Sequence, residues 1–233
     1  DLTVEEFIEN VNTVKMAIIG QTANLAPADK KLYALRDVTA TVDHISLIAS
    51  SIMSKKLAAG SDVIVLDVKT GSGAFMKKEA DAVALAREMV QIGTNAGRET
   101  VAIISDMNQP LGYAVGNVLE VKEAIDTLRG NGPADLLELC LILGSYMIVG
   151  TKCAQSIEEA RQRLHQTIIN GQALKKLEEF VIAQKGDAKA IEDPSLFPKA
   201  SIVMEILAEE SGFVEKIETD EIGMVSLILG GGR

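Results

Sequence analysis

The sequence predicts an α/β fold with a mixed, mostly parallel sheet flanked by helices, together with part of a smaller all-α lobe. Residues 62–68 and 99–105 are rich in β-branched and other apolar side chains, which is typical of buried strands. Between them lie a small-residue loop and a helix at residues 78–96 that ends at Gly97. Strand, loop, helix, glycine and strand in this order are typical of parallel βαβ units. Residues 43–59 add a helix that carries polar side chains among apolar ones.

The N-terminal segments precede this unit. Residues 2–14 alternate acidic and apolar positions as an amphipathic helix does, and Thr3 to Glu6 fits a capping box. The apolar run at residues 16–19 predicts a short buried strand, and residues 20–30 are expected to form a loop.

The helix predicted at residues 43–59 has recognisable end signals. Asp43 is the expected N-cap, and Gly60 is the expected residue just beyond the C-terminal end. Ser51 and Lys55 are one turn apart on this helix and project from the same face.

The second half of the chain is mainly helical up to residue 183. Residues 117–129 predict a helix, residues 135–149 an almost uncharged and buried helix, and residues 156–183 an amphipathic helix or pair of helices interrupted at Gly171. Residues 186–198 contain two prolines and are expected to be a surface loop. The alternating pieces of residues 200–229 predict antiparallel strands.

Composition excludes several classes of function. The net charge of −10 argues against a nucleic-acid partner, which requires a basic face. No run of eighteen apolar residues is present, so no membrane span is expected. Cys140 and Cys153 lack metal-ligand spacing and are interpreted as reduced, buried thiols of a cytoplasmic protein.

Motifs for nucleophilic or metal catalysis are absent from the sequence. The two histidines, His44 and His165, have no triad-like partners, and His165 is expected at the surface. The loop at residues 71–75 (GSGAF) is either a phosphate cradle or a strand-to-helix turn that needs small residues. Its Phe75 follows a strand, where an aromatic ring can form the wall of a site for a flat ligand.

The remaining candidate is a cationic and hydroxyl-bearing group formed by Arg36, Ser51 and Lys55. A guanidinium offers a planar fork of donors, whereas an ammonium is a point charge. Together these groups suit a planar, oxygen-rich and partly anionic ligand. Lys55 near the end of a helix is equally compatible with a solvated last turn.

Two stretches resemble a known enzyme family. Residues 20–76 (GQTANLAPADKKLYALRDVTATVDHISLIASSIMSKKLAAGSDVIVLDVKTGSGAFM) and residues 106–125 (DMNQPLGYAVGNVLEVKEAI) are similar to the pyrimidine-nucleoside phosphorylases, and the likeness extends over essentially the whole chain. The resemblance implies a nucleoside phosphorylase or phosphoribosyltransferase-like fold. It also implies reversible phosphorolysis of uridine, thymidine and deoxyuridine to the free base and (deoxy)ribose 1-phosphate, without an organic cofactor.

The resemblance assigns the base-binding residues. It implies that Arg36, Ser51 and Lys55 hydrogen-bond the pyrimidine ring, with Arg36 and Lys55 acting in catalysis. The base pocket would be lined by four further side chains at Tyr33, Val42, Ile48 and Phe75. The chain departs from the family at residues 44–46, where His-Ile-Ser replaces the usual Ser-Ile-Pro.

The resemblance also implies an ion and an assembly. A potassium or calcium ion would be held by Leu111, Ala114 and Glu123, of which only Glu123 offers a side-chain oxygen. From the sequence alone, Glu123 is interpreted as a solvated carboxylate on a helix surface. The family is homodimeric, so a homodimer is expected.

The implied domain division has three parts. Residues 1–29 would begin the α/β domain, residues 30–60 would belong to the α lobe with the base-binding residues, and residues 61–233 would continue the α/β domain as far as a truncated C-terminus. The chain is accordingly expected to be a central segment of a longer polypeptide. The family's phosphate-gripping KHSTGG loop would precede Asp1.

Two other functions remain open at this point. One is an enzyme similar to anthranilate phosphoribosyltransferase, which would require a pyrophosphate loop with magnesium-binding carboxylates. The other is a non-catalytic fragment that binds the base alone, because the phosphate loop is not in this sequence.

Overall fold

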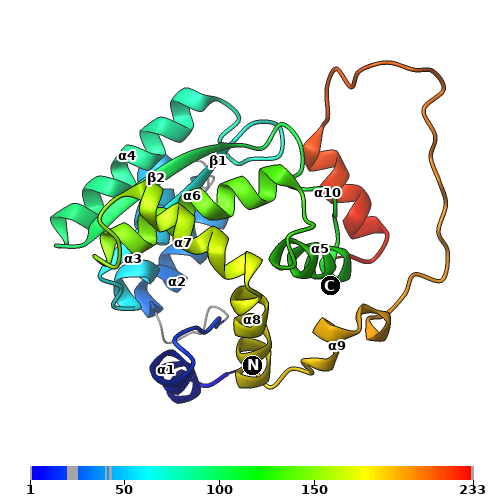
Figure 1. Ribbon diagram of the computed structural model, residues 1–233. Coiled ribbons are helices and arrows are strands. Elements are labelled where there is room, and N and C mark those ends of the chain that lie inside the picture. Colours follow the sequence, from blue (N-terminus) through cyan, green and yellow to red (C-terminus); the bar gives the residue numbers. More distant parts are fainter. Residues whose placement is uncertain (1, 20–25, 40, 42–43, 232–233) are drawn as a thin grey trace.

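Two parallel strands and the helices around them form the centre of the molecule (Figure 1). The computed structural model describes residues 2–19, 26–39, 41 and 44–231. Strand β1 (Val63–Thr70) pairs in parallel with β2 (Glu99–Asp106), in a register that places Val63 opposite Glu99. Helix α4 (Glu79–Asn95) connects them. The predicted α/β class with a parallel sheet is therefore confirmed.

The two faces of the sheet are covered by different helices. Alternate residues of β1, namely Ile64, Leu66 and Val68, are buried in the core with residues of α4 and of α3 (Ile45–Ala58). On the other face, Val63 lies against Gly150 of α6 (Ala134–Gly150). Because Asp67 is exposed, β1 is not buried on both faces as its composition predicted.

Three glycines end helices as the sequence predicts. Gly60 after α3, Gly97 after α4 and Gly130 after α5 (Asn117–Leu128) have positive φ angles of 78°, 72° and 85°. Such angles are strained for residues with a side chain, which explains the choice of glycine. The N-cap of α3 is His44, and the predicted cap Asp43 lies outside the described residues.

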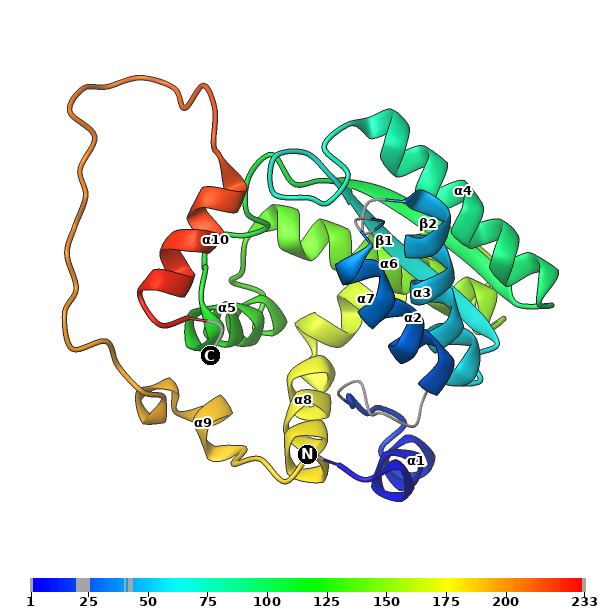
Figure 2. The same ribbon diagram turned by 180° about the vertical axis from the view of Figure 1, so that it is seen from behind.

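The regions near both ends of the chain are also helical. Helix α1 (Val4–Thr13) has the predicted capping box and lies beside α8 (Gln172–Ala183), where Asn10 Nδ2 donates to the Ala183 carbonyl at 3.0 Å (Figure 2). The predicted pair at residues 156–183 is confirmed as α7 (Ile157–Ile169) and α8, separated by Gly171 at φ 75°. Short α9 (Lys189–Glu192), the 3-10 turn Pro194–Leu196 and α10 (Thr219–Ile228) follow.

Several sequence predictions are wrong. Residues 16–19 form no strand, and residues 20–30 are not all loop, because helix α2 (Pro27–Val38) begins at Pro27. Residues 200–229 contain no antiparallel strands. Residues 197–218 have no helix or strand, no described strand pairs with them, and α10 follows (Figure 1).

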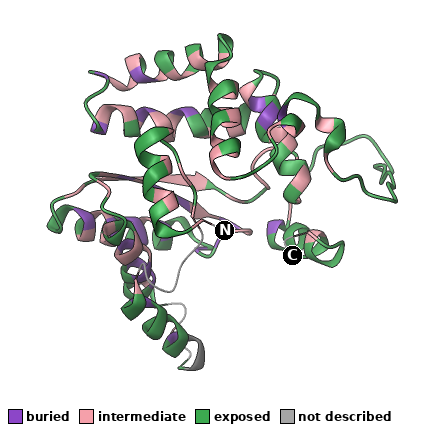
Figure 3. Ribbon diagram, turned by 90° about the horizontal axis from the view of Figure 1, so that it is seen from below, coloured by how far each residue is buried: buried purple, intermediate pink, exposed green. Residues whose placement is uncertain are grey.

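Burial also differs from expectation toward the C-terminus. Helix α6 buries only Leu141, Ser145 and Gly150, although its composition predicted a buried helix. The free thiols of Cys140 and Cys153 are exposed rather than buried, whereas His165 is exposed as predicted. Buried residues cluster in the helices around the sheet, and the chain near the C-terminus is mostly exposed (Figure 3). None of the described helices has the length and apolar character needed to cross a membrane.

Candidate active site

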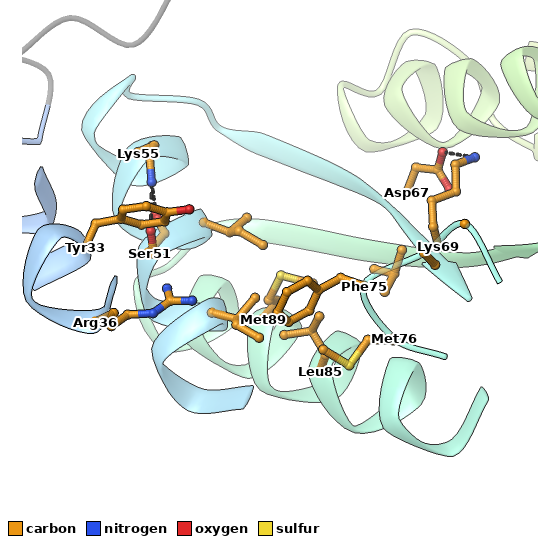
Figure 4. A pocket seen from close by; sticks show the side chains of 15 residues that line it. Tyr33, Arg36, Ser51, Lys55, Asp67, Lys69, Phe75, Met76, Leu85 and Met89 are labelled. Carbon is orange, nitrogen blue, oxygen red and sulfur yellow. Dashed lines mark hydrogen bonds and ion pairs between the residues drawn. The ribbon is translucent and has the colours of Figure 1, made fainter. Parts of the chain in front are cut away.

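The candidate site lies where α2 and α3 face the loop that follows β1 (Figure 4). On α2, Asp29, Tyr33 and Arg36 follow the spacing i, i+4, i+7, which places them on one helix face. On α3, Ile48, Ser51 and Lys55 follow the similar spacing i, i+3, i+7. Two helices thus present their polar side chains to the same space.

Lys55 makes three hydrogen bonds within the protein. Its Nζ donates to Asp29 Oδ2 at 2.7 Å, to the Ser51 carbonyl at 2.8 Å and to Ser51 Oγ at 2.9 Å. The Lys55 side chain is 25% exposed and that of Asp29 is 7% exposed. The ammonium is therefore directed by contacts from both helices and does not extend into solvent as a solvated last turn would.

The Asp29 carboxyl is ionised in this setting. Burial favours its neutral form, but hydrogen bonds from Lys55 and Ser51 and the positive charges of Lys55 and Arg36 outweigh that effect, so the pKa of Asp29 lies below its usual value. Sequence reasoning did not select Asp29. Its i, i+4, i+7 relation to Tyr33 and Arg36 is the signal that would have found it.

Arg36 is buried, with 7% of the residue exposed. Its Nη1 donates to the Leu47 carbonyl at 3.3 Å, and its guanidinium carbon lies 5.1 Å from the centre of the Tyr33 ring, within the range of a cation–π contact. These contacts set the plane of the guanidinium, which matters because its donors form a rigid fork.

These side chains line one cavity of about 500 Å³. Arg36, Ser51, Lys55, Tyr33 and Ile48 line it from α2 and α3, and Phe75 lines it from the loop after β1. Phe75 is 57% exposed, so its ring is available to a ligand. Sequence reasoning missed several lining residues, of which one lies on α3 and the others on β1, the loop after it and α4, namely Ile52, Asp67, Val68, Lys69, Gly73, Ala74, Met76, Leu85 and Met89. Val42, the remaining predicted pocket residue, lies outside the described residues.

The glycines of the loop at residues 71–75 are explained by close packing. A Cβ on Gly71 would lie 2.7 Å from the backbone nitrogen of Asn108, and one on Gly73 would lie 2.5 Å from Thr219 Cγ2. The loop amides are also engaged, since Gly73 N donates to the Met107 carbonyl at 2.9 Å and Ser72 N to Asn108 Oδ1 at 3.0 Å. The geometry favours the small-residue turn over the phosphate cradle.

The residues predicted to hold an ion lie together elsewhere. Leu111, Ala114 and Glu123 line one cavity beside α10. Glu123 Oε1 accepts hydrogen bonds from Tyr113 N at 2.8 Å and Ala114 N at 3.0 Å. Within the described residues, no hydrogen bond reaches Glu123 Oε2, and no group of three acidic, histidine or cysteine side chains could bind a metal. A cation here would depend on one carboxylate oxygen and on backbone carbonyls, which suits a hard ion.

Known proteins resemble this chain over its full length. Proteins named pyrimidine-nucleoside phosphorylase from Bacillus subtilis (strain 168) and Geobacillus stearothermophilus are each 59% identical to it over 233 residues, which is 100% of this chain and 54% of the relative. One of the same name from Staphylococcus haemolyticus (strain JCSC1435) is 58% identical over the same lengths. The resemblance predicted from the sequence is confirmed, and the chain spans about half the length of these relatives.

A family model points the same way. The model described as "Glycosyl transferase family, a/b domain" matches residues 1–174. That match includes both strands of the sheet and every residue of the α2–α3 cavity. The chain therefore belongs to this glycosyl transferase family.

Proposed function

We propose that the chain is the base-binding part of a pyrimidine-nucleoside phosphorylase. The reaction would be reversible phosphorolysis of uridine, thymidine and deoxyuridine to the free base and (deoxy)ribose 1-phosphate, with phosphate as co-substrate and no organic cofactor. The observation that carries this proposal is the shared cavity of Arg36, Ser51 and Lys55, with the Phe75 ring at its border. The names of the relatives support it.

The chemistry of the reaction calls for such a site. Cleavage of the glycosidic bond leaves its electron pair on the pyrimidine, so negative charge develops on the ring and its carbonyl oxygens. Donors from Arg36 and Lys55 would contact those oxygens, and their attraction would grow as the charge develops. Interactions that are stronger in the transition state than in the bound substrate are the ones that accelerate a reaction.

The aromatic and aliphatic groups have a different task. Phe75 and Ile48 would hold the flat ring by its faces, while Tyr33 would support the plane of the Arg36 guanidinium. Ser51, whose Oγ is 2.9 Å from Lys55 Nζ, would orient the ring by its hydroxyl.

The direct test measures product formation by the full-length protein. Uridine and phosphate should give uracil and ribose 1-phosphate in equal amounts, and no uracil should form without phosphate. Lys55→Ala should lower kcat by about 10²–10³-fold, the usual effect of removing one donor to a developing anion. Lys56→Ala is the matched control, because the neighbouring Lys56 is exposed and does not line the cavity. Full turnover in Lys55→Ala would contradict the assignment, and uracil binding without turnover would favour a non-catalytic base-binding fragment.

We further propose that Leu111, Ala114 and Glu123 bind a potassium or calcium ion. Their common cavity supports this, and so do the hydrogen bonds from Tyr113 N and Ala114 N, which engage Glu123 Oε1 rather than Oε2. The test is activity and thermal stability of the full-length protein after dialysis against a chelator and choline chloride, with potassium or calcium restored separately. Wild type should recover with one of these ions and Glu123→Gln should not; equal recovery of both proteins would contradict the site.

The assembly is also a proposal. A homodimer is supported by apolar side chains that remain exposed on α1 and α2, namely Val4, Ile8, Val11, Leu32 and Leu35. Light scattering of the full-length protein should give twice the chain mass, and a monomer mass would contradict it.

We also propose a cytoplasmic location and a division into three parts. Two free cysteines favour a reducing cytoplasmic location, which cell fractionation would test. The proposed division is into residues 1–29, 30–60 and 61–233. Limited proteolysis would test its second boundary, since it should cut near the exposed Gly60, just beyond α3, before it cuts within the helices.

A further inference from the structure

Asp29 is a buried carboxylate next to the candidate site, and the reaction described above does not use it. Only 7% of the residue is exposed. It is not one of the residues that line the α2–α3 cavity, whereas Lys55, which it contacts, does line it. Asp29 therefore lies behind the ammonium as seen from the cavity. A ligand in the cavity would meet Lys55 and would not touch Asp29.

The contacts of Lys55 limit what its ammonium can do. An ammonium has three N–H donors, and three acceptors lie within 2.9 Å: Asp29 Oδ2, the Ser51 carbonyl and Ser51 Oγ. The carboxylate and the carbonyl can only accept. The hydroxyl can rotate and can itself donate, so it is the acceptor that Lys55 can exchange for a ligand oxygen at the smallest cost.

The net charge near the cavity also supports a role for Asp29. Arg36 and Lys55 bring two positive charges, while Asp67 and Lys69 form an ion pair at 2.7 Å that contributes no net charge. The carboxylate of Asp29 reduces the total near the cavity to one positive charge. One positive charge matches a leaving pyrimidine that carries one negative charge. Without Asp29, the positive charges of Arg36 and Lys55 would line the same partly desolvated cavity uncompensated.

We propose that Asp29 is a positioning residue that holds the Lys55 ammonium in place for the leaving base. Two of the N–H donors stay bound to Asp29 and to the Ser51 carbonyl, and the third moves from the Ser51 hydroxyl to a carbonyl oxygen of the pyrimidine. The Ser51 hydroxyl keeps its hydrogen bond to Asp29, and its released oxygen is then free to accept a hydrogen bond from a ring N–H. This role rests on the proposed phosphorolysis, but the contact itself can be tested separately.

The kinetic test uses Asp29→Asn in the full-length protein. The amide has nearly the size of the carboxylate but lacks its charge, so kcat should fall by about 10²-fold, as misplacement of a catalytic group does. KM should change much less, because the lost contribution belongs to the transition state. Asp29→Glu keeps the charge and should recover part of the activity. Asp81→Asn is the matched control, since Asp81 is the third residue of α4, as Asp29 is of α2, but is exposed.

A double-mutant cycle separates positioning from a purely structural role. If Asp29 acts through Lys55, Asp29→Asn should cause no further loss of kcat/KM in a Lys55→Ala background. An equal loss in both backgrounds would overturn the proposal. So would unchanged kcat in Asp29→Asn alone.

A second measurement does not depend on turnover. Competitive acetylation followed by mass spectrometry compares Lys55 with its exposed neighbour Lys56. The ratio of Lys55 to Lys56 labelling should rise several-fold in Asp29→Asn and stay unchanged in Asp81→Asn. If wild type releases no base but this ratio rises, the proposed function fails and the Asp29 contact stands. If wild type is active and the ratio is unchanged, the positioning role fails and the proposed function stands.

Discussion

In the part of the chain that the structure describes, two ion pairs join neighbouring helices, and their surroundings differ. Lys55 on α3 pairs with Asp29 on α2, where the side chains are 25% and 7% exposed. Arg161 on α7 pairs with Glu138 on α6, where they are 41% and 50% exposed, and Arg161 Nη1 donates to Glu138 Oε1 at 2.8 Å. In the exposed pair a planar guanidinium contacts a carboxylate. Such a contact is usually stronger than that of an ammonium with a carboxylate.

Exposure to water, more than contact geometry, decides whether an ion pair holds its charged side chains in one place. Water screens the Arg161 pair, so either partner can be solvated instead. The Asp29 carboxylate has little access to water, so the partner on α3 is held in one place. A fixed cation beside a cavity can act on a ligand, whereas a screened cation on a surface cannot.

The largest expected effect concerns Arg36, the second cation of the cavity. Arg36→Ala should lower kcat/KM for uridine phosphorolysis by about 10²–10³-fold, because a donor to the leaving base is lost. Arg36→Lys should recover little of this, since a point charge does not reproduce the planar fork that lies over the Tyr33 ring. Steady-state rates of the full-length variants check both statements. Recovery to wild-type rates in Arg36→Lys would show that charge alone matters.

The next effect is the pH dependence of stability that arises from the Asp29–Lys55 pair. The folded-state pKa of Asp29 lies below the ordinary value of 3.8, so its ionised form stabilises the fold above pH 3.8, and this stabilisation is lost as the pH falls through the lower folded-state value. Wild type should therefore lose stability on acidification below pH 3.8 more steeply than Asp29→Asn. Urea unfolding at several pH values measures this. Parallel curves for the two proteins would contradict the assignment.

A smaller effect is expected for the apolar wall of the cavity. Phe75→Ala should raise KM by about 2–10-fold, equivalent to about 0.5–1.5 kcal/mol for a lost aromatic contact. The value of kcat should remain within a factor of about two, because ring stacking is nearly equal in the substrate and the transition state. Phe180→Ala on α8 is a control, as that phenylalanine does not line the cavity. A fall in kcat as large as that of Arg36→Ala would mean that Phe75 does more than hold the ring.

The smallest effect belongs to the exposed pair. Arg161→Ala should change neither the unfolding midpoint nor kcat beyond the error of measurement, because water replaces the contact to Glu138. Thermal unfolding and steady-state kinetics on the same preparation test this. A loss comparable to that of Asp29→Asn would remove the distinction drawn between the two pairs.

The same difference in surroundings explains which elements the sequence could predict. Strand β1 and helix α4 bury apolar side chains at regular spacing, and Ala102 and Ile104 of β2 pack against the same core, so the hydrophobic patterns of these elements predicted them. Helix α2 has the reverse pattern of burial. Its buried side chains, where described, are the polar Asp29 and Arg36, while Leu32 and Leu35 are exposed. A method that looks for a buried apolar face cannot find such a helix, although Pro27 at its first position was a usable signal.

Residues 202–207 and 213–214 show the opposite case, in which an apolar pattern predicted strands that do not form. Their alternating apolar pattern predicted strands, yet these residues are largely exposed and no described strand pairs with them. A strand requires a partner for its backbone hydrogen bonds, and the pattern of one segment says nothing about that partner. Of the candidate site, Arg36, Ser51 and Lys55 could be selected from their residue types. Asp29 was not selected, because its importance arises from the contact between two helices, and only its spacing to Tyr33 and Arg36 offered a signal.

The central claim is that Arg36 and Lys55 stabilise the negative charge on the departing pyrimidine. The most direct measurement is the single-turnover rate of phosphorolysis for a series of 5-substituted uridines whose bases differ in acidity, in wild type and in Lys55→Ala. We expect the rate of Lys55→Ala to rise more steeply with the acidity of the leaving base, because the base must then carry its charge without the ammonium. Equal slopes in the two proteins would contradict it.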